Sequence, residues 1–508
     1  MGIIDSKMIV FNLLTGILSV VVQFAVSFFL SPFIVKNLGA EANGFTQLAA
    51  NFVMYASLLT VSFNSMAGRF ISVNYHRKNY ESARFFFSSV YAANLTIILL
   101  FIPSSLYVVN NLPHIIDIGN SNVWDVEILF LCVFFNFFIS LIISLYSISM
   151  FVRNMVFYMN LLNTVKVIFN ALLLLLFFTY LPIKLYYVTF VGLLLNFILL
   201  PFYIRIHKKI LPSLTFSKKN ISLSSLKELF LSGIWNTVNQ CGHLLNTGLD
   251  LLLANLLINP YSMGLLAVSK TIPSAIIQLA TTINSNFAPS IVQIWAEGDK
   301  QKLLNNLKVS MKISSVLISV PIITFCCFGH SFYKLWQPTL ESEILTMLSI
   351  VACFTFIPVA GTQTLYNVFT ASNKLQFNSL TYIFTGLLNV LFVYLGVKYF
   401  RGYEIFVIVI TSTFLSIIRS LFVILPYISS LLNLKWYFFY KYVMFSLLCS
   451  SINVIIALPF VFFSNNDCWT KLIINLVFVA AISLFLESLL VLNKNERGFI
   501  FKKIGVKI

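Results

Sequence analysis

Residues 206–227, IHKKILPSLTFSKKNISLSSLK, form the one long polar stretch that interrupts an otherwise apolar chain. About six apolar segments precede this stretch and about eight follow it. Each segment has roughly 20 residues or more, which is the length that an α-helix needs to cross the ~30 Å hydrocarbon core of a bilayer. The pattern predicts an all-α polytopic membrane protein with about 14 transmembrane helices.

The composition excludes a soluble protein. The mean hydropathy is +0.91, and 59% of the residues are hydrophobic while 10% are charged; soluble domains carry about 25% charge. The net charge of +17 does not indicate nucleic-acid binding, because most lysines and arginines fall in alternate loops and in the C-terminal tail. That bias marks the cytoplasmic side of a membrane protein. It predicts a multi-pass protein with both termini cytoplasmic and with membrane lipids around it.

A faint internal repeat of about 220 residues runs through the apolar segments. It aligns Gly44 with Gly264, Asn64-Ser65 with Asn284-Ser285, Ile71 with Ile291, and Tyr75 with Trp295. Internal repeats with a substrate path at their interface are typical of secondary transporters. The repeat predicts a six-helix lobe at 1–206, a cytoplasmic linker at 207–227 and a second six-helix lobe at 228–428. Two additional helices and a basic cytoplasmic tail complete the chain at 429–508.

Polar stretches that follow the second and the eighth segment occupy equivalent places in this repeat. They lie at about 74–84 and 296–306. We expect them to form short amphipathic segments that lie on the membrane surface.

Polar residues recur at helical spacing in four of the apolar segments. The seventh segment carries Asn236, Asn239, His243, Asn246 and Asp250, spaced 3, 4, 3 and 4, which predicts one stripe along a helix. The eighth carries Lys270, Ser274, Gln278, Thr281 and Ser285, and the first lobe has Ser19, Gln23, Ser27, Gln47, Asn51 and Asn64. Gln23 is the repeat equivalent of His243. Stripes at repeat-related places favour a hydrated cavity between the lobes; the alternative is interhelical hydrogen bonding within a packed bundle.

Charged residues inside apolar segments deserve separate treatment, because each costs about 2.5–3.5 kcal/mol to place in lipid. Asp250 and Lys270 lie at comparable depth in adjacent segments, which allows an ion pair; a purely structural salt bridge is the alternative reading. Lys166 and Arg419 lie close enough to cytoplasmic ends to extend their charges to the interface.

Three residues are candidates for ion coupling or anion capture. His243 titrates near neutral pH, and Asp250 can bind a proton or a cation, so either is a candidate for coupling transport to H⁺ or Na⁺. Arg69, at the cytoplasmic end of the second segment, is a candidate for receiving a phosphate group; a positive-inside anchor explains it equally well.

Signatures of enzymes and cofactors are not found in the sequence. There is no phosphate-binding loop of the P-loop form, and the five histidines are scattered with none at ligand spacing. We therefore expect a protein that is not an enzyme, with no catalytic residue, no metal and no cofactor.

One opening motif resembles a known family. Residues 28–39, FFLSPFIVKNLG, are followed by EANG at 41–44, and NPYSMG at 259–264 restarts the pattern. This opening resembles the first two helices of bacterial polysaccharide-repeat-unit flippases, the O-antigen and capsule translocases of the multidrug/oligosaccharidyl-lipid/polysaccharide exporter superfamily. The resemblance covers essentially the whole chain, because the span count, the two lobes and the cytoplasmic termini agree with it.

The resemblance implies a V-shaped molecule with a central cavity lined by the first, second, seventh and eighth helices. Such proteins move an undecaprenyl-pyrophosphate-linked oligosaccharide from the inner to the outer leaflet of the bacterial cytoplasmic membrane by alternating access, for surface polysaccharide biosynthesis. Lys270 would attract the pyrophosphate, with Asp250 modulating it, and polar side chains would bind sugar hydroxyls. The candidate substrate-binding residues are Lys270, Asp250, Asn239, His243, Asn246, Gln278, Gln23, Asn51 and Arg69. A polysaccharide polymerase and a chain-length regulator are the expected protein partners.

Three other functions stay open. An ion-coupled multidrug or metabolite exporter of the same superfamily would carry a carboxylate within the first lobe, where this chain has no deep acid. A flippase for a lipid-linked peptidoglycan precursor would have a more strongly cationic cavity. A membrane polysaccharide polymerase would need a large outer loop, and the outer loops here are short.

Overall fold

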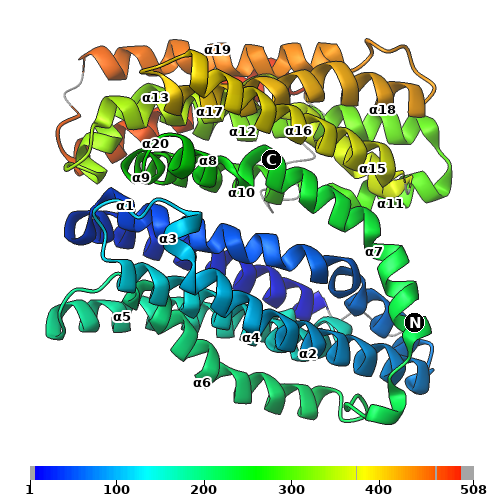
Figure 1. Cartoon of the computed structure of the whole chain (residues 1–508). Coiled ribbons are helices and arrows are strands. Elements are labelled where there is room, and N and C mark those ends of the chain that lie inside the picture. The colour runs from blue at the N-terminus through cyan, green and yellow to red at the C-terminus, as the bar shows by residue number, and fades with distance from the viewer. Residues whose placement is uncertain (1–5, 373, 464–465, 494–508) are drawn as a thin grey trace. The chain divides into compact units, whose positions relative to one another are not determined.

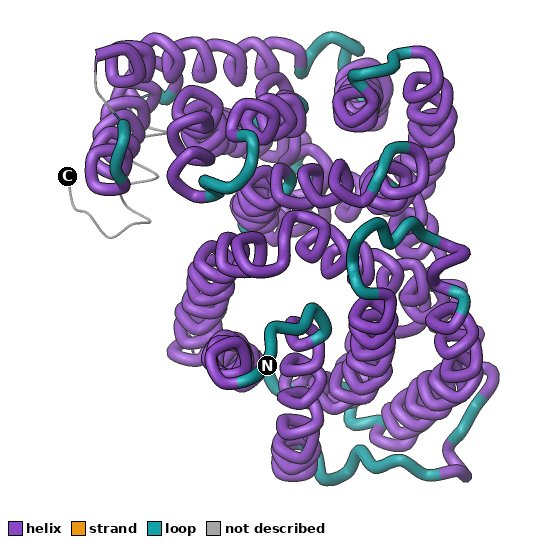
Figure 2. The backbone as a smooth tube through the Cα atoms, turned by 60° about the vertical axis from the view of Figure 1, so that its left-hand side comes forward, coloured by secondary structure: helices purple, strands orange, loops and turns teal. Residues whose placement is uncertain are grey.

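The computed structural model describes residues 6–372, 374–463 and 466–493, and within them it contains helices and connecting loops but no strand (Figures 1 and 2). By contacts the chain forms two compact units, 1–244 with 251–264, and 245–250 with 265–508. The first unit holds α1 (Ser6–His76), α2 (Tyr80–Asn110), α3 (Leu112–Ile115), α4 (Val123–Val152), α5 (Val156–Tyr180), α6 (Tyr187–Ile210), η1 (Lys218–Asn220) and α7 (Leu223–His243). The predicted basic tail at 494–508 lies outside the described residues.

The second unit is also helical. The segments η2 (Leu244–Gly248), α8 (Asp250–Leu257) and α9 (Pro260–Ser269) contribute to both units. They are followed by α10 (Thr271–Ser285), α11 (Ala288–Glu297), α12 (Lys300–Trp336), α13 (Ser342–Phe354), α14 (Phe356–Val359), η3 (Gly361–Leu365), α15 (Tyr366–Ala371), α16 (Leu375–Tyr399), α17 (Glu404–Ile418), η4 (Arg419–Ile424), α18 (Leu425–Leu431), α19 (Tyr440–Phe463) and α20 (Trp469–Val491).

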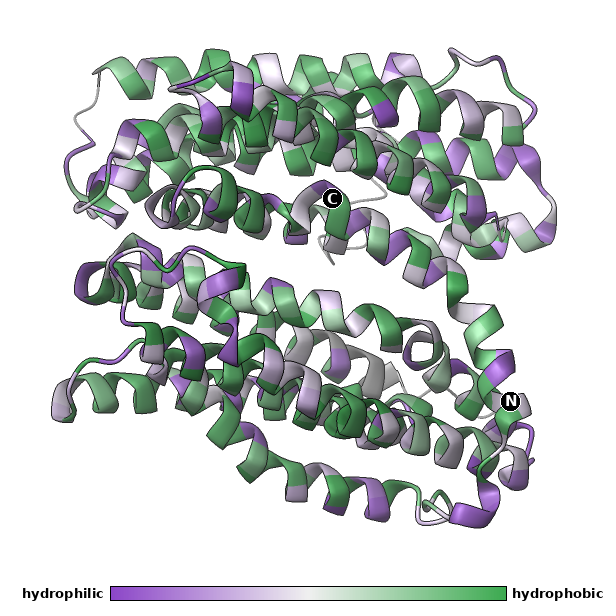
Figure 3. Cartoon of the chain, in the orientation of Figure 1, coloured by the Kyte–Doolittle hydropathy of each residue, from purple (hydrophilic) through white to green (hydrophobic). Residues whose placement is uncertain are grey.

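The prediction of a polytopic membrane protein is confirmed. Within the described residues, twelve helices are long and apolar enough to cross a membrane. Hydrophobic residues predominate along these helices (Figure 3). Large side chains such as Leu99 and Phe485 are more than 60% exposed, as lipid-facing residues are. One of the twelve, Leu14–His76, has 63 residues and, at 1.5 Å per residue, a contour of about 95 Å, enough for more than one crossing. The count of about 14 stays a prediction.

The long helix α1 reverses direction at Gly39. The backbone there has φ 86° and ψ 168°, which is non-helical and suits glycine because it has no Cβ. Near one end of α1, Asn12 Nδ2 donates to Asn154 O at 2.8 Å; at the other, His76 Nε2 lies 3.0 Å from Val152 O. Both ends therefore meet the same α4–α5 turn, so the two arms of α1 run antiparallel.

The polar stretch that divides the sequence is shorter than predicted. Helix α6 continues to Ile210, and α7 already begins at Leu223, where the Ser222 side chain caps it by accepting from Ser225 N at 3.2 Å. The segment between them is fastened to α2. Ser89 Oγ accepts from Ser222 N at 2.8 Å, and the linker is irregular between the two helices apart from the single turn η1.

Residues 74–84 and 296–306, expected to form short amphipathic segments, are instead the ends of neighbouring helices and the tight turns between them. Helix α1 extends to His76 and α2 begins at Tyr80, with Lys78 at φ 61° in a tight turn. Helix α11 ends at a left-handed Gly298, and α12 starts directly after Asp299, whose side chain accepts from Lys302 N at 2.9 Å. Helix-capping residues close both connections, which sequence hydropathy does not register.

Glycines allow the closest backbone approaches in the first unit. Gly44 and Gly264, the two glycines that the repeat aligns, touch: a Cβ built on Gly264 would lie 2.5 Å from the Ala40 carbonyl oxygen. Gly233 of α7 packs in the same way on Ser62 of α1. Helix α7, predicted to open the second lobe, thus packs on α1 within the first unit. The two lobes at 1–206 and 228–428 are inferred from the sequence repeat, and they stay a prediction.

In the second unit, α12 is the central helix. It packs against α13, α19, α20 and the turn η3. Short polar links join these layers: Ser315 Oγ and Ser446 Oγ are 2.8 Å apart, and Ser446 Oγ accepts from Gly361 N at 3.1 Å. The two C-terminal helices are therefore an integral part of this unit.

Candidate functional site

The candidate site of the second unit is built where two membrane helices are interrupted. The segment Leu244–Gly248 is a π-helical turn between α7 and α8. A second break falls at Lys270, between the end of α9 and the start of α10. Interrupted helices are typical of binding sites in transporters, and π-turns are frequently found at functional sites.

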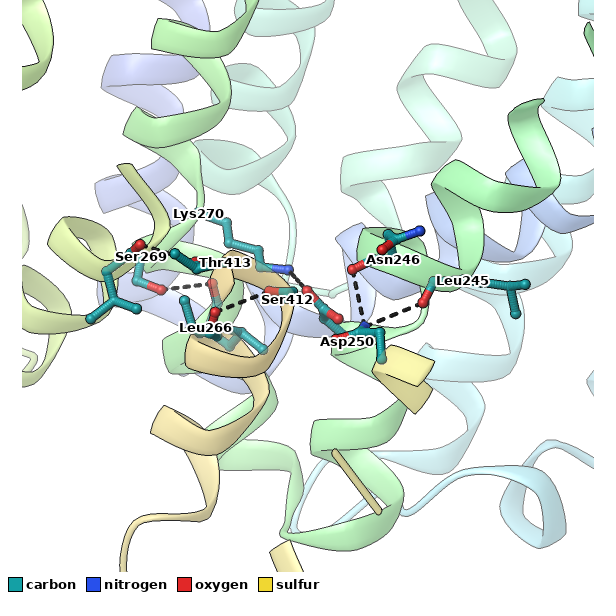
Figure 4. Close-up of polar contacts among 11 residues, drawn as sticks. Leu245, Asn246, Asp250, Leu266, Ser269, Lys270, Ser412 and Thr413 are labelled. Atoms are coloured by element: carbon teal, nitrogen blue, oxygen red, sulfur yellow. Dashed lines mark hydrogen bonds and ion pairs between the residues drawn. The ribbon is translucent and has the colours of Figure 1, made fainter. Parts of the chain in front are cut away.

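The two charged residues singled out from the sequence occupy these two breaks and form an ion pair. Lys270 Nζ donates to Asp250 Oδ2 (Figure 4). The Asp250 side chain is 1% exposed and that of Lys270 is 21% exposed. Asp250 is the first residue of α8 and Lys270 follows the last residue of α9. Lys270 is also the N-cap residue of α10, so it lies at the junction of two helical segments.

Pro273 has no N–H group, so the Ser269 carbonyl lacks its usual partner four residues further on. Neighbouring helices supply replacement donors. Ser349 Oγ donates to Ser269 O at 2.7 Å, and Tyr333 Oη donates to the same carbonyl at 3.3 Å. All three residues are buried. In a membrane such replacement bonds are required, because lipid cannot satisfy a backbone carbonyl.

Helix α16 holds the π-turn in place. Asn389, fully buried, donates through Nδ2 to Leu245 O at 3.3 Å and to Asn246 O at 3.2 Å. Asn246 in turn donates through Nδ2 to Tyr382 O at 2.9 Å. Asn246 is thus fixed within the protein at 1% exposure, one turn before Asp250.

A second π-turn contains a buried arginine, and here the sequence-based expectation is wrong. Arg419, expected to extend to the membrane interface, is 6% exposed. It opens η4 and lies over the Tyr382 ring at 4.3 Å. Its Nη2 also donates to Asn378 Oδ1 at 2.6 Å. Helix α16 thereby links both π-turns through Tyr382.

The single polar stripe predicted for residues 236–250 is divided. His243 is exposed, whereas Asn246 and Asp250 are buried. A π-turn contains one extra residue, which rotates everything beyond it by about 100° relative to an unbroken α-helix. Before the turn, Asn236 of α7 donates to Ser65 Oγ of α1 at 3.1 Å, and Asn239 is partly buried on the same helix.

Of the other predicted site residues, Gln278 lies on α10 of the second unit, and Gln23, Asn51 and Arg69 lie on α1 of the first unit. Gln23 and Arg69 on α1 are exposed, as is Gln278 on α10, while Asn51 is partly buried. Gln23 and Gln278 lie well inside apolar helices, where an exposed amide needs water or a polar ligand because lipid offers no hydrogen bond. Their roles in substrate binding stay predictions.

The described residues contain no group of three or more His, Cys, Asp or Glu side chains that could hold a metal ion. The ion pair and its surroundings can bind and exchange charged groups.

Comparison with known proteins identifies the fold. No family model matches the chain. An uncharacterized membrane protein of Bacillus subtilis, EpsK, is 27% identical over 480 residues, which is 94% of each chain. A solved structure of the lipid II flippase MurJ in an inward closed conformation matches 97% of this chain and 99% of its own, with a TM-score of 0.66 and 13% identity. An inward-facing multidrug resistance MATE family transporter of the MOP superfamily covers 81% of this chain and 95% of its own, with a TM-score of 0.63 and 14% identity. The chain is therefore a multi-pass membrane protein with the fold of MOP-superfamily transporters.

Proposed function

We propose that this protein is a flippase that moves undecaprenyl-pyrophosphate-linked oligosaccharide repeat units from the inner to the outer leaflet of the cytoplasmic membrane by alternating access, for surface polysaccharide biosynthesis. The proposal places the protein in a bacterial inner membrane with both termini cytoplasmic. It includes coupling to H⁺ or Na⁺, and a polysaccharide polymerase and a chain-length regulator as partners.

The extent of the structural match supports a lipid-linked substrate over a small soluble one. The MurJ structure covers 97% of the chain, and the MATE structure covers 81%. The chain also ends in two helices, α19 and α20, that pack on the central helix α12 as part of the second unit. The nearly full-length match and the packed C-terminal helix pair therefore fit the MurJ structure better than the MATE structure.

The observation that carries the proposal is the charge arrangement at Lys270. Its ammonium group is paired with a buried carboxylate, yet 21% of the side chain stays exposed. An anionic diphosphate can therefore compete with Asp250 for the ammonium group without the full desolvation of a second buried charge. Lysine is a common point-charge ligand for phosphate.

Exposed amides complete the proposed recognition. Gln278 of α10, about two turns beyond Lys270, presents a hydrogen-bonding group within an apolar helix of the second unit. Gln23 of α1 is a separate candidate in the first unit. Sugar hydroxyls both donate and accept, which suits amide side chains. The Lys270–Asp250 pair has little net charge, and the amide side chains are neutral. This combination suits a neutral sugar chain on one diphosphate better than a strongly acidic peptidoglycan precursor, which is the second candidate substrate.

The test is the leaflet distribution of lipid-linked precursors in a deletion strain. We expect loss of surface polymer, with complete repeat units trapped on the cytoplasmic side. Repeat units that reach the outer leaflet unpolymerised would instead identify a polymerase. Normal polymer with altered drug tolerance would favour the exporter.

A further inference from the structure

A second buried carboxylate lies far along the chain from the Lys270–Asp250 pair, in the C-terminal helix pair. Glu487 belongs to α20 and is completely buried. Helix α20 packs against α12 and α19, so this acid lies where three helices of the second unit meet. The proposed transport site makes no use of it.

Glu487 is surrounded by neutral polar groups. Ser319 Oγ of α12 lies 3.3 Å from Oε1 and 3.1 Å from Oε2 of the carboxyl group. The same Ser319 oxygen accepts from Asn453 Nδ2 of α19 at 3.2 Å. Ser319 and Asn453 are both at least 98% buried. The three helices are thus connected through one polar cluster.

The cluster as described has no positive charge. None of the ion pairs among the described residues involves Glu487. Side-chain hydrogen bonds from Ser319, Cys449 and Asn453 reach the carboxyl group, and none of these three side chains carries a positive charge. A carboxylate buried in a membrane protein requires a proton or a cation, because desolvation of the bare charge is prohibitively unfavourable.

Three further buried oxygens of the neighbourhood have no hydrogen-bond partner among the described residues. They are Asn453 Oδ1, Ser450 Oγ and Ser483 Oγ. Ser483 lies one turn before Glu487 on α20, and Ser450 lies one turn before Asn453 on α19, so each shares a face with a member of the cluster. A proton on Glu487 provides a single donor, whereas a bound cation contacts several oxygens at once.

We propose that Glu487, Asn453, Ser319 and Ser483 form a Na⁺-binding site within the C-terminal helix pair. Hard cations prefer carboxylate, amide and hydroxyl oxygens, which are the groups present. One carboxylate balances one positive charge, which favours a monovalent ion over Ca²⁺ or Mg²⁺. The bound ion links α12, α19 and α20, and the inference does not depend on the proposed flippase function.

The test is equilibrium binding of ²²Na⁺ to the purified full-length protein in detergent micelles, with choline chloride holding the ionic strength constant. We expect saturable binding that unlabelled NaCl displaces. Glu487→Gln should weaken it at least about tenfold, because ligand charge sets cation affinity. Glu343→Gln is the matched control, since Glu343 is an exposed acid in the first turn of α13.

A second variant protects the test against a Glu487 substitution that fails to fold. Asn453→Ala keeps the carboxylate and removes one proposed ligand, so it should also weaken Na⁺ binding. The proposal is overturned by wild-type protein that binds no Na⁺, by Glu487→Gln or Asn453→Ala protein that binds it normally, or by an equal loss of binding in Glu343→Gln.

Discussion

Removing Lys270 should destabilise the protein more than removing its partner Asp250 does. Lys270→Met leaves a carboxylate whose side chain is 1% exposed, whereas Asp250→Asn leaves an ammonium group on a side chain that is 21% exposed. Breaking a buried pair by removing one member costs about 3–5 kcal/mol. We expect Lys270→Met to fall near the lower end of that range, at about 3 kcal/mol, and Asp250→Asn to cost about 1–2 kcal/mol since lysine can turn its charge toward water.

The double variant Asp250→Asn/Lys270→Met isolates the interaction itself. Two unit charges about 4 Å apart attract by about 4 kcal/mol at an effective dielectric constant of 20, and the partial exposure of Lys270 lowers this. Residues in direct contact show coupling energies of about 0.5–3 kcal/mol. We expect coupling near the top of this range, so the double variant should be more stable than Lys270→Met.

The assay is equilibrium unfolding of the four proteins in mixed micelles, followed by far-ultraviolet circular dichroism. Additive effects of the two substitutions, or equal losses from each, would refute the burial argument. Surface polymer in cells carrying the double variant then separates stability from transport. If the pair is only structural, restored stability should restore polymer; if Lys270 binds diphosphate, polymer should stay absent.

Three more predictions follow from the packing and from the π-turns. Gly264→Ala should destabilise the first unit by about 1–3 kcal/mol through overpacking, because its Cβ would lie 2.5 Å from the Ala40 carbonyl. Gly68→Ala is the control and should be nearly neutral, because the nearest contact of its Cβ would be 3.5 Å away. Thermal unfolding in detergent compares the two variants. In a background without the seven native cysteines, Gln278→Cys should react with a membrane-impermeant maleimide and Asn246→Cys should not. The reason is that Gln278 is exposed whereas Asn246 is 1% exposed. Faster labelling of Asn246→Cys than of Gln278→Cys would contradict the rotated face beyond the π-turn. Arg419→Lys should lower thermal stability, because lysine cannot reproduce both the stacking on Tyr382 and the hydrogen bond to Asn378. An unchanged melting temperature would show that the positive charge alone matters.

Much of the architecture could be predicted from the chain because membrane insertion is a local property. Each apolar segment is favoured in lipid by its own composition, so the helices and the polytopic class follow from residues next to one another. The Lys270–Asp250 pair followed from depth alone, because isolated charges at matching depths in neighbouring segments have few other partners.

The interior of the second unit could not be predicted in this way. A π-turn at 244–248 depends on acceptors and donors that α16 brings from about 140 residues away, through Asn389 and Tyr382. Without that turn, residues 236–250 form a single stripe; with it, His243 and Asp250 face different surroundings. The same long-range packing buries Arg419, which hydropathy places near an interface.

The sequence by itself therefore determined which segments cross the membrane and which residues are too polar for lipid. Only the tertiary structure decided what those polar residues meet: a helix break for Lys270, a tyrosine ring for Arg419 and a serine–asparagine cluster for Glu487. The reason is that transfer of a segment into lipid sums contributions along the chain, whereas the satisfaction of a buried polar group depends on atoms that folding brings from distant helices.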